Sequence, residues 1–306
     1  MRSVNFKFDF VGKRKLFFIL SASILLLGIA SLLIQGLNLG VDFVSGSRVD
    51  VSIGQEFDLE EGRAILEKLG YENPSIRKAG NENELLVFRT DENLEVEKVN
   101  EIRDQFREKF GEQVAVNEQT VDPIVGRELA KNAMISVLIA SVGIILYVTI
   151  RFEYRFAMTA VLALFHDALF VIGIFSIFQW EVDLVFVAAV LTIVGYSVND
   201  TIVVFDRIRE NIEIEQPKRW EDLKEAVNRS LQQTLVRSIN TGLTVIFAAA
   251  ALFAFGGESI RYFSLALLLG LFAGIYSSVF VASQVWITWK WKSMEREKLK
   301  AKAVTE

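Results

Sequence analysis

The sequence predicts an α-helical polytopic membrane protein with six transmembrane helices and one small extracytoplasmic α+β domain between the first and second helices. Its 306 residues are 52% hydrophobic with a mean hydropathy of +0.34, which is too apolar for an ordinary soluble domain. Several apolar runs approach the ~20 residues that a helix needs to cross ~30 Å of hydrocarbon. The one long polar stretch lies between the first two runs, and strand and helix patterns alternate within it.

The apolar runs place the six spans near residues 16–36, 132–150, 156–178, 184–206, 236–255 and 262–289. The first span is not expected to be a cleaved signal peptide, because its apolar run is too long and Gln35-Gly36-Leu37 is unlike a cleavage site. We therefore divide the chain into a cytoplasmic N-terminus with the first span (1–37), an outer domain (38–131), a five-helix membrane region (132–289) with a cytoplasmic loop (207–235), and a basic cytoplasmic tail (290–306).

Basic residues orient these spans, since the cytoplasmic segments of membrane proteins carry an excess of Lys and Arg. They gather in residues 1–15, at Arg151 and Arg155, in residues 207–237 and in the tail, whereas Gln179–Asp183 carries acids and no base. With six spans, all of these basic segments and both termini lie in the cytoplasm.

Charge is split between the two sides of the membrane. Residues 38–131 hold 12 basic and 21 acidic residues, a net charge of −9, and the rest of the chain carries +4. Positive-inside bias and anionic lipid explain the basic side, so no nucleic acid is expected as a partner. The sequence has no cysteine, which excludes disulfides, thiol catalysis and zinc–thiolate sites.

The outer domain is predicted to be a ferredoxin-like βαββαβ unit. We expect strands at 47–53, 75–79, 85–90 and 114–121, with one helix ending near 69–70 and another over 96–110. Asp58 and Glu61 form a capping box, residues 80–83 form a hairpin turn, and Gly111 ends the second helix. The domain has no His and no acids at metal-ligand spacing, so no metal, cofactor or catalytic site is expected. A compact spacer is favoured over a surface that contacts an emerging chain or a partner domain.

An Asn199-Asp200 pair interrupts the apolar run that opens at Leu184. It lies roughly seven residues from the first basic residue, which at ~1.5 Å per helical residue buries Asp200 about 10 Å below the membrane surface. An intramembrane carboxylate is costly and needs a partner, a proton or a water path. Asp200 is therefore a candidate ion or proton site.

Polar residues of the fourth and fifth spans follow helical spacing. Thr192, Tyr196, Asn199, Val203 and Asp206 form a stripe on the fourth span, and Arg237, Asn240, Thr241 and Thr244 share one face of the fifth. Asp200 and Arg237 have similar depths, so each is the natural partner of the other. The alternative is a static ion pair with bridging amides, in which each bond contributes only ~1 kcal/mol.

Three further patterns leave alternatives open. His166-Asp167 lies in the middle of the third span, where it suits a proton relay or a plain helix contact equally. Gly270, Gly274 and Ser278 recur every four residues in the last span, which is typical of close helix packing. Residues 218–235 are predicted to form an amphipathic helix at the inner membrane interface, or else a docking surface for a cytoplasmic partner.

Four patches resemble the SecF family of protein-export membrane proteins, a branch of the resistance-nodulation-division superfamily. They are Leu37–Phe43 after the first span, His166-Asp167, the long signature from Gly195 to Asn211, and Arg237–Thr241. The likeness covers almost the whole chain. One departure is Ser45-Gly46-Ser47, where the family usually shows Gly-Gly-Thr, and it concerns local turn geometry.

The resemblance implies a transport role in the bacterial cytoplasmic membrane and no enzymatic activity. The chain would pair with SecD as a twelve-span unit, associate with the SecYEG channel, with YidC and YajC as further partners, and use the proton or sodium motive force to promote preprotein export. Asp200 would be the coupling carboxylate, Arg237 its charge partner, and Asn199, Asn240 and Thr241 their neighbours.

Other functions fit the sequence less well. A small-molecule or lipid exporter of the same superfamily usually has larger outer domains and twelve spans in one chain. An intramembrane hydrolase would need a Ser-His dyad, a metal motif or paired acids. A passive translocon scaffold differs from the coupled subunit in one respect: it would tolerate Asp200→Asn.

Overall fold

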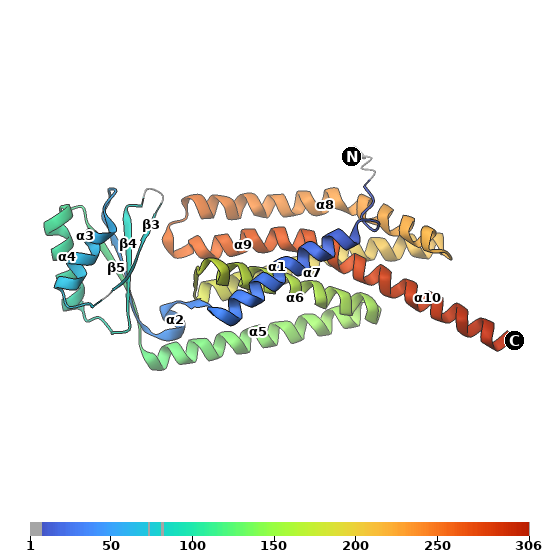
Figure 1. Ribbon diagram of the computed structural model, residues 1–306, viewed down its shortest axis with the longest axis horizontal. Helices are drawn as coiled ribbons and strands as arrows, with labels where there is room; N and C mark the ends of the chain where they lie inside the picture. Colours follow the sequence, from blue (N-terminus) through green and yellow to red (C-terminus); the bar gives the residue numbers. More distant parts are fainter. Residues whose placement is uncertain (1–7, 73, 81–82, 306) are drawn as a thin grey trace.

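The computed structural model describes residues 8–72, 74–80 and 83–305, and six helices in this part of the chain are long and apolar enough to cross a membrane. They are α1 (Arg14–Ile34), α5 (Pro123–Arg151), α6 (Tyr154–Phe178), α7 (Leu184–Glu215), α8 (Trp220–Phe255) and a last helix formed by α9 (Glu258–Ser277), the π-helical segment η1 (Ser278–Ala282) and α10 (Ser283–Thr305). The six-span fold is thus confirmed. The start of α1 and the end of α10 lie at one end of the bundle, here the inner end, and the strand-containing domain covers the outer end (Figure 1).

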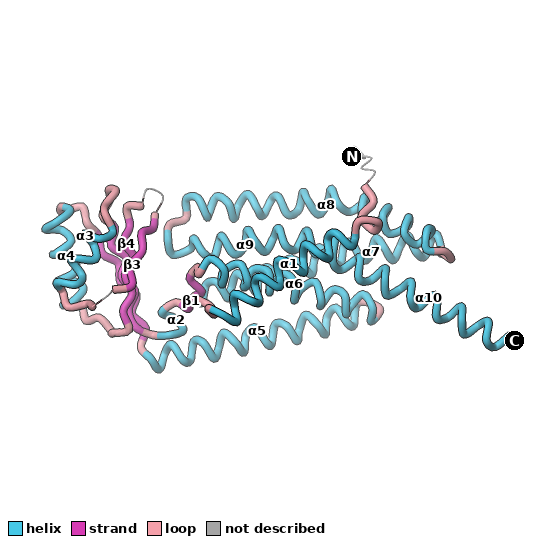
Figure 2. The backbone as a smooth tube through the Cα atoms, in the orientation of Figure 1, coloured by secondary structure: helices cyan, strands magenta, loops and turns pink. Residues whose placement is uncertain are grey.

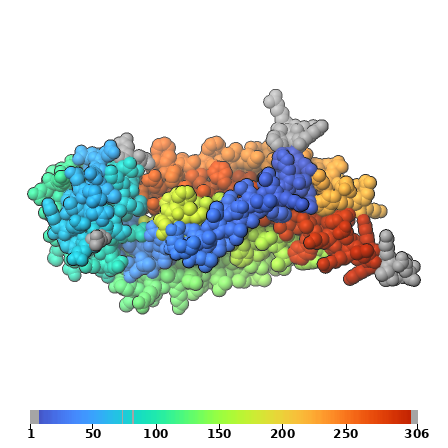
Figure 3. Space-filling model, viewed as in Figure 1, coloured from blue at the N-terminus to red at the C-terminus, as the bar shows by residue number. Residues whose placement is uncertain are grey.

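Helix α9 lies at the centre of the bundle, packed against α6, α7 and α8. A Cβ atom at Gly270 would lie 2.3 Å from Cδ1 of Ile193 on α7, and a Cβ atom at Gly274 would lie 3.2 Å from Cβ of Ser197. The predicted packing role of these small residues is therefore confirmed. Gly28 of α1 and Gly173 of α6 also meet closely, and α1 lies across the outside of the bundle (Figure 3).

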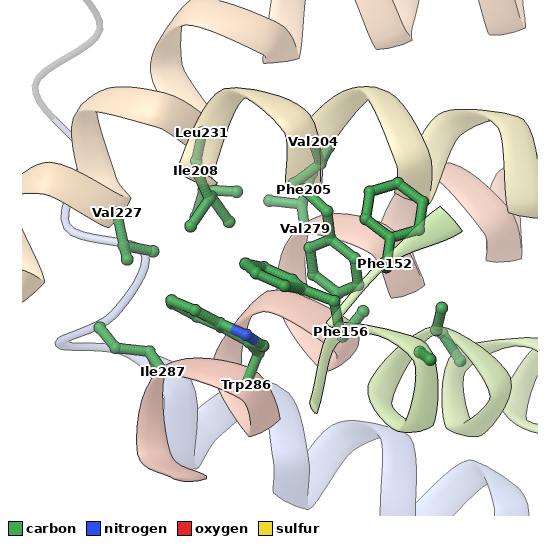
Figure 4. Close-up of a cluster of buried hydrophobic side chains, with 14 of the residues drawn as sticks. Phe152, Phe156, Val204, Phe205, Ile208, Val227, Leu231, Val279, Trp286 and Ile287 are labelled. Carbon is green, nitrogen blue, oxygen red and sulfur yellow. The ribbon is translucent and has the colours of Figure 1, made fainter. Parts of the chain in front are cut away.

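Aromatic side chains close the inner end of the bundle (Figure 4). The ring of Trp286 stacks on Phe156 with 4.5 Å between centroids, and Phe205 of α7 lies 4.8 Å from Phe156. Leu223 and Val227 of α8 are fully buried in the same core.

The N-terminal part of α8 corrects one expectation. Residues 218–235 were predicted to lie along the inner interface, but from Trp220 onward they are the first turns of α8 itself. Their apolar face packs on the extension of α7 beyond the membrane run, because Ile208 of α7 presents a matching apolar surface. The segment therefore forms a helical hairpin with α7.

The outer domain has the predicted βαββαβ order. Its elements are β2 (Gly46–Ser52), α3 (Leu59–Lys68), β3 (Ser75–Ala79), β4 (Leu85–Thr90), α4 (Val96–Phe110) and β5 (Ala115–Val121). The antiparallel sheet has the strand order β3-β4-β2-β5, which is that of a ferredoxin-like fold. Helices α3 and α4 cover one face of the sheet, and the other face looks toward the bundle (Figure 2). The β3–β4 register confirms the hairpin, although residues 81–82 of its turn lie outside the described residues.

Two boundaries of the outer domain differ in detail from the sequence-based expectation. Asp58 caps α3 by accepting the N–H of Glu60, at 3.1 Å, so the described hydrogen bonds do not form the expected capping box with Glu61. Helix α5 begins at Pro123, capped by Asp122, so residues 123–131 are the first turns of the second membrane helix. A continuous helix thus leads from the sheet into the bundle.

Candidate functional site

Asp200 lies on α7 where this helix meets α8 and α9. Its side chain is half-buried, and Oδ2 is buried without a hydrogen-bond partner. Asp200, Ser238 and Thr241 border a cavity of about 20 Å³ between the three helices, which is room for about one water molecule. A buried carboxylate oxygen without a donor is costly. The site therefore suits a proton, a water molecule or a small cation.

Arg237 does not form the expected ion pair with Asp200. The described residues contain no ion pair of 4 Å or shorter between them, and the Arg237 side chain is exposed. Arg237 instead lines a wide cleft of about 660 Å³ with Asp206 and Gln233 toward the inner end. The reason is the rotation of α8 about its axis, which directs the polar face that carries Arg237 outward. The neighbouring residue, Ser238, borders the Asp200 cavity in its place.

The two predicted polar stripes do lie together. The hydroxyl of Tyr196 on α7 donates to the carbonyl oxygen of Thr241 on α8, at 3.2 Å. Asn199, Asn240 and Thr241 are exposed on this face, as is Arg237. Polar and charged side chains at membrane depth normally face protein or water, because lipid cannot satisfy them. We therefore do not expect this face of the bundle to contact the acyl chains of the membrane.

Asp206 lies in an ionic network toward the inner end of α7. Its carboxylate lies 3.4 Å from Arg151 and 3.2 Å from Arg209. It is half-buried at the mouth of the wide cleft, so it belongs to a partly solvated ionic network and not to the buried site.

Asp167 is fully buried, and three side chains form hydrogen bonds with its carboxyl group. His166 Nδ1 lies 3.0 Å from Oδ1, and the hydroxyls of Ser197 on α7 and Ser277 on α9 donate to Oδ2 at 2.5 and 2.8 Å. Two hydroxyl donors from different helices share Oδ2, so this oxygen acts as a hydrogen-bond acceptor. Asp167 therefore joins α6, α7 and α9.

Ser278, which directly follows α9, makes a second polar contact between helices. Ser278 Oγ lies 2.9 Å from Thr201 Oγ1, one residue from Asp200. The π-helical segment η1 begins at Ser278, and such segments are frequent at functional sites. The small-residue pattern predicts only packing for Ser278, and it does not indicate Ser277, whose partner Asp167 is 110 residues away in the sequence.

A second buried charge cluster lies at the outer end, and no sequence pattern predicts it. Glu181, in the two-residue strand β6 (Glu181–Val182) between α6 and α7, has a side chain only 2% exposed. Three arginines of the outer sheet contact its Oε2: Arg89 at 2.6 Å, Arg48 at 3.3 Å and Arg77 at 3.4 Å. Burial alone would raise the pKa of Glu181, but these guanidinium groups hold it below its ordinary value of 4.5.

Backbone pairing reinforces this junction. Strand β1 (Asn38–Leu39) pairs in parallel with β6, and the short helix α2 (Val41–Val44) follows it. Asp42 accepts the N–H of Leu184, the first residue of α7, at 3.0 Å. Gly40 faces Glu181 so closely that an added Cβ atom would lie 3.1 Å from Oε1. The residues from Asn38 to Asp42 therefore bind the α6–α7 turn.

No cluster of three or more His, Asp or Glu side chains that could hold a metal ion occurs among the residues that the structure describes. The chemistry open to the site around Asp200 is therefore that of a single carboxylate with hydroxyl and amide neighbours.

Comparison with known proteins gives two family matches. The model for the C-terminal region of the SecD/SecF protein export membrane proteins matches residues 101–292, and the model for the SecD/SecF GG motif matches residues 30–56. The second match includes Ser45-Gly46-Ser47 despite its departure from the usual pattern.

Individual relatives cover nearly the whole chain. The chain is 41% identical to a protein translocase subunit SecF from Alicyclobacillus acidocaldarius, over 95% of both chains. It is 45% identical to the protein translocase subunit SecDF of Bacillus subtilis, over 95% of this chain and 39% of that relative. The crystal structure of SecDF from Thermus thermophilus is similar, with a TM-score of 0.85 and 34% identity, over 95% of this chain and 40% of that one. The chain thus spans about two fifths of these SecDF chains.

Proposed function

Because the chain belongs to the SecD/SecF family of protein export membrane proteins, we propose that it is a multi-pass subunit of the Sec translocase auxiliary complex that uses a proton or sodium gradient to promote preprotein transport. The observation that carries the coupling role is Asp200, whose unpartnered oxygen borders a cavity of about 20 Å³. A structural carboxylate would be expected to have its donors in place, as Asp167 does. Of these two carboxyl groups, Asp200 is the one with an oxygen free to bind a proton, a water molecule or a small cation.

The expected partner in the membrane is a SecD-like chain. The polar face formed by Asn199, Arg237, Asn240 and Thr241 is exposed in this chain, and a second membrane protein would cover it. Relatives named SecDF are more than twice as long as this chain, and their name joins SecD to SecF, which supports a SecD-like partner. SecYEG, YidC and YajC are proposed as further partners in the bacterial cytoplasmic membrane, with both termini in the cytoplasm.

Asp200 and Arg237 are proposed to act in alternation. Their separation fits a step in which Asp200 carries a proton or a cation, because a neutralised carboxylate does not need the guanidinium. Loss of the ion leaves a charge in the membrane that favours approach of Arg237. Movement of one charge across 100 mV supplies ~2.3 kcal/mol, enough to shift a two-state equilibrium about 50-fold. Asn199, Asn240 and Thr241 would supply neutral ligands or water contacts along the way.

His166 and Asp167 keep two open roles. The hydrogen bonds of Asp167 to two other helices support a structural contact. A relay through His166 is the alternative, and the titration of His166 in the intact complex would decide between them.

The proposed function is tested by reconstitution. Purification from native membranes should recover a SecD-like chain with this one. Vesicles that hold both chains with SecYEG and SecA should translocate a preprotein faster when a proton or sodium gradient is imposed, and the matching ionophore should remove that stimulation. A rate that no ionophore changes would leave only a scaffold role.

A further inference from the structure

Several side-chain contacts hold the outer domain on the bundle, and three of them converge on one carboxylate. Glu181 Oε2 receives Arg48 from β2, Arg77 from β3 and Arg89 from β4, so three strands of one sheet meet a single buried oxygen. All three guanidinium groups reach the α6–α7 turn of the bundle, and one face of the sheet looks toward the bundle (Figure 2). This cluster, Glu181 with Arg48, Arg77 and Arg89, is here called the arginine junction.

The arginine junction lies between the two helices that carry the intramembrane carboxylates. Glu181 is in the turn from Gln179 to Asp183, which joins α6, the helix of Asp167, to α7, the helix of Asp200. The turn is short, and β1 and Asp42 hold its backbone. Any displacement of α7 relative to α6 must therefore move Glu181.

We propose that Glu181 is a positioning residue that transmits ion occupancy at Asp200 to the orientation of the outer domain. The inference rests on the proposed coupling role of Asp200 and adds the route by which that role reaches the outer face. The two segments that connect the outer domain to α1 and α5 would by themselves allow the sheet to pivot, because each is a single stretch of backbone. Three arginines on one anion resist a pivot, because any rotation lengthens at least one of these contacts.

The partners of each arginine show why Glu181 is the critical acid. Arg48 also holds Asp50 in a bidentate pair at 2.8 and 3.1 Å, and Arg77 also contacts Glu258 of α9 at 3.0 Å. Arg89 has the shortest contact to Glu181, and among the described residues its other polar contacts are to the neutral Asn38 and the Leu39 carbonyl. Loss of the Glu181 charge therefore releases β4 first.

The test uses fluorescent labels on a chain that has no cysteine of its own. Glu108→Cys on α4 and Phe255→Cys at the outer end of α8 are both exposed positions. Single-molecule energy transfer between the two labels is recorded in vesicles that contain the partner chain, with and without an imposed ion gradient. The variants are Glu181→Gln and Arg89→Gln. The matched control is Glu92→Gln, which removes a carboxylate of the same domain whose one ion-pair partner in the described part of the chain is the exposed Lys98.

The labelled wild type and Glu92→Gln should show a gradient-dependent change in transfer efficiency, and Glu181→Gln and Arg89→Gln should lose it. Arg89→Gln keeps the test decisive where Glu181→Gln does not fold. A wild-type response in both variants overturns the proposal, as does the absence of any response in the wild type. Asp200→Asn separates the two ideas: if it keeps the response while Glu181→Gln loses it, the junction stands and the proposed role of Asp200 fails.

Discussion

Ser277→Ala tests whether Asp167 is a buried anion held by hydroxyl donors from other helices. The substitution removes one of two hydroxyl donors to a carboxyl group that is fully buried. A hydrogen bond to a charged group contributes ~1.5–3 kcal/mol, whereas neutral bonds between membrane helices average ~0.6 kcal/mol. Because Ser197 and His166 remain, we expect a loss of about 1.5–2 kcal/mol in the free energy of unfolding. The measurement is unfolding in mixed micelles by titration with a denaturing detergent.

Ser264→Ala is the matched control. Ser264 lies on the same helix and is equally buried, but its hydroxyl donates to Ile260 of its own helix, at 2.8 Å, and to no other residue that the structure describes. Removal of this hydroxyl should lower the free energy of unfolding by less than about 0.5 kcal/mol. In the Asp167→Asn background, Ser277→Ala should lose most of its effect, because the charged acceptor is gone. Equal losses for Ser277→Ala and Ser264→Ala would refute the assignment of Asp167 as a charged acceptor.

Three further outcomes are expected. Arg237→Ala should reduce gradient-driven export, and the double variant with Asp200→Asn should be little worse than either single one; strictly additive losses in translocation rate would show that the two residues act independently. Ser45, where the family usually has glycine, has φ +66°, a conformation that suits glycine, so Ser45→Gly should raise the free energy of unfolding by about 1 kcal/mol in the same detergent titration; a decrease would contradict this. Because the pKa of Glu181 is lowered in the folded protein, its contacts with the arginines are complete above pH 4.5 and are lost only as the pH falls through the lower folded value. Energy transfer between the two labels measures release of the outer domain, and release near pH 6 would contradict this prediction.

Local pattern was enough to predict the elements of this fold. The apolar runs gave the six spans, and alternation with turn residues gave the βαββαβ order, because both signals depend on neighbours in the chain. Motifs also pointed to Asp200 and Asp167. The ion pair between Asp200 and Arg237 could not be predicted reliably, because residue spacing gives a shared helix face but not the direction in which that face turns in the bundle.

The arginine junction shows a different limit. Arg48 and Asp50 alternate with Val49 and Val51 on β2, a pattern typical of a sheet with one solvated face. Nothing in such a pattern distinguishes water from the end of a helical bundle as the surroundings of the polar face. Glu181 likewise has no partner nearby in the sequence. Its arginines are 92 to 133 residues away, so only the folded chain shows the cluster.

The central claim is that Asp200 couples an ion gradient to transport. Gradient-stimulated preprotein translocation in vesicles with the SecD-like partner and SecYEG tests it most directly, with Asp200→Asn compared with Asp206→Asn. The control makes the same chemical change on the same helix, at a half-buried residue paired with Arg151 and Arg209. We expect Asp200→Asn to insert normally and lose the stimulation, and Asp206→Asn to keep it. Wild-type stimulation in the Asp200→Asn vesicles would contradict the account.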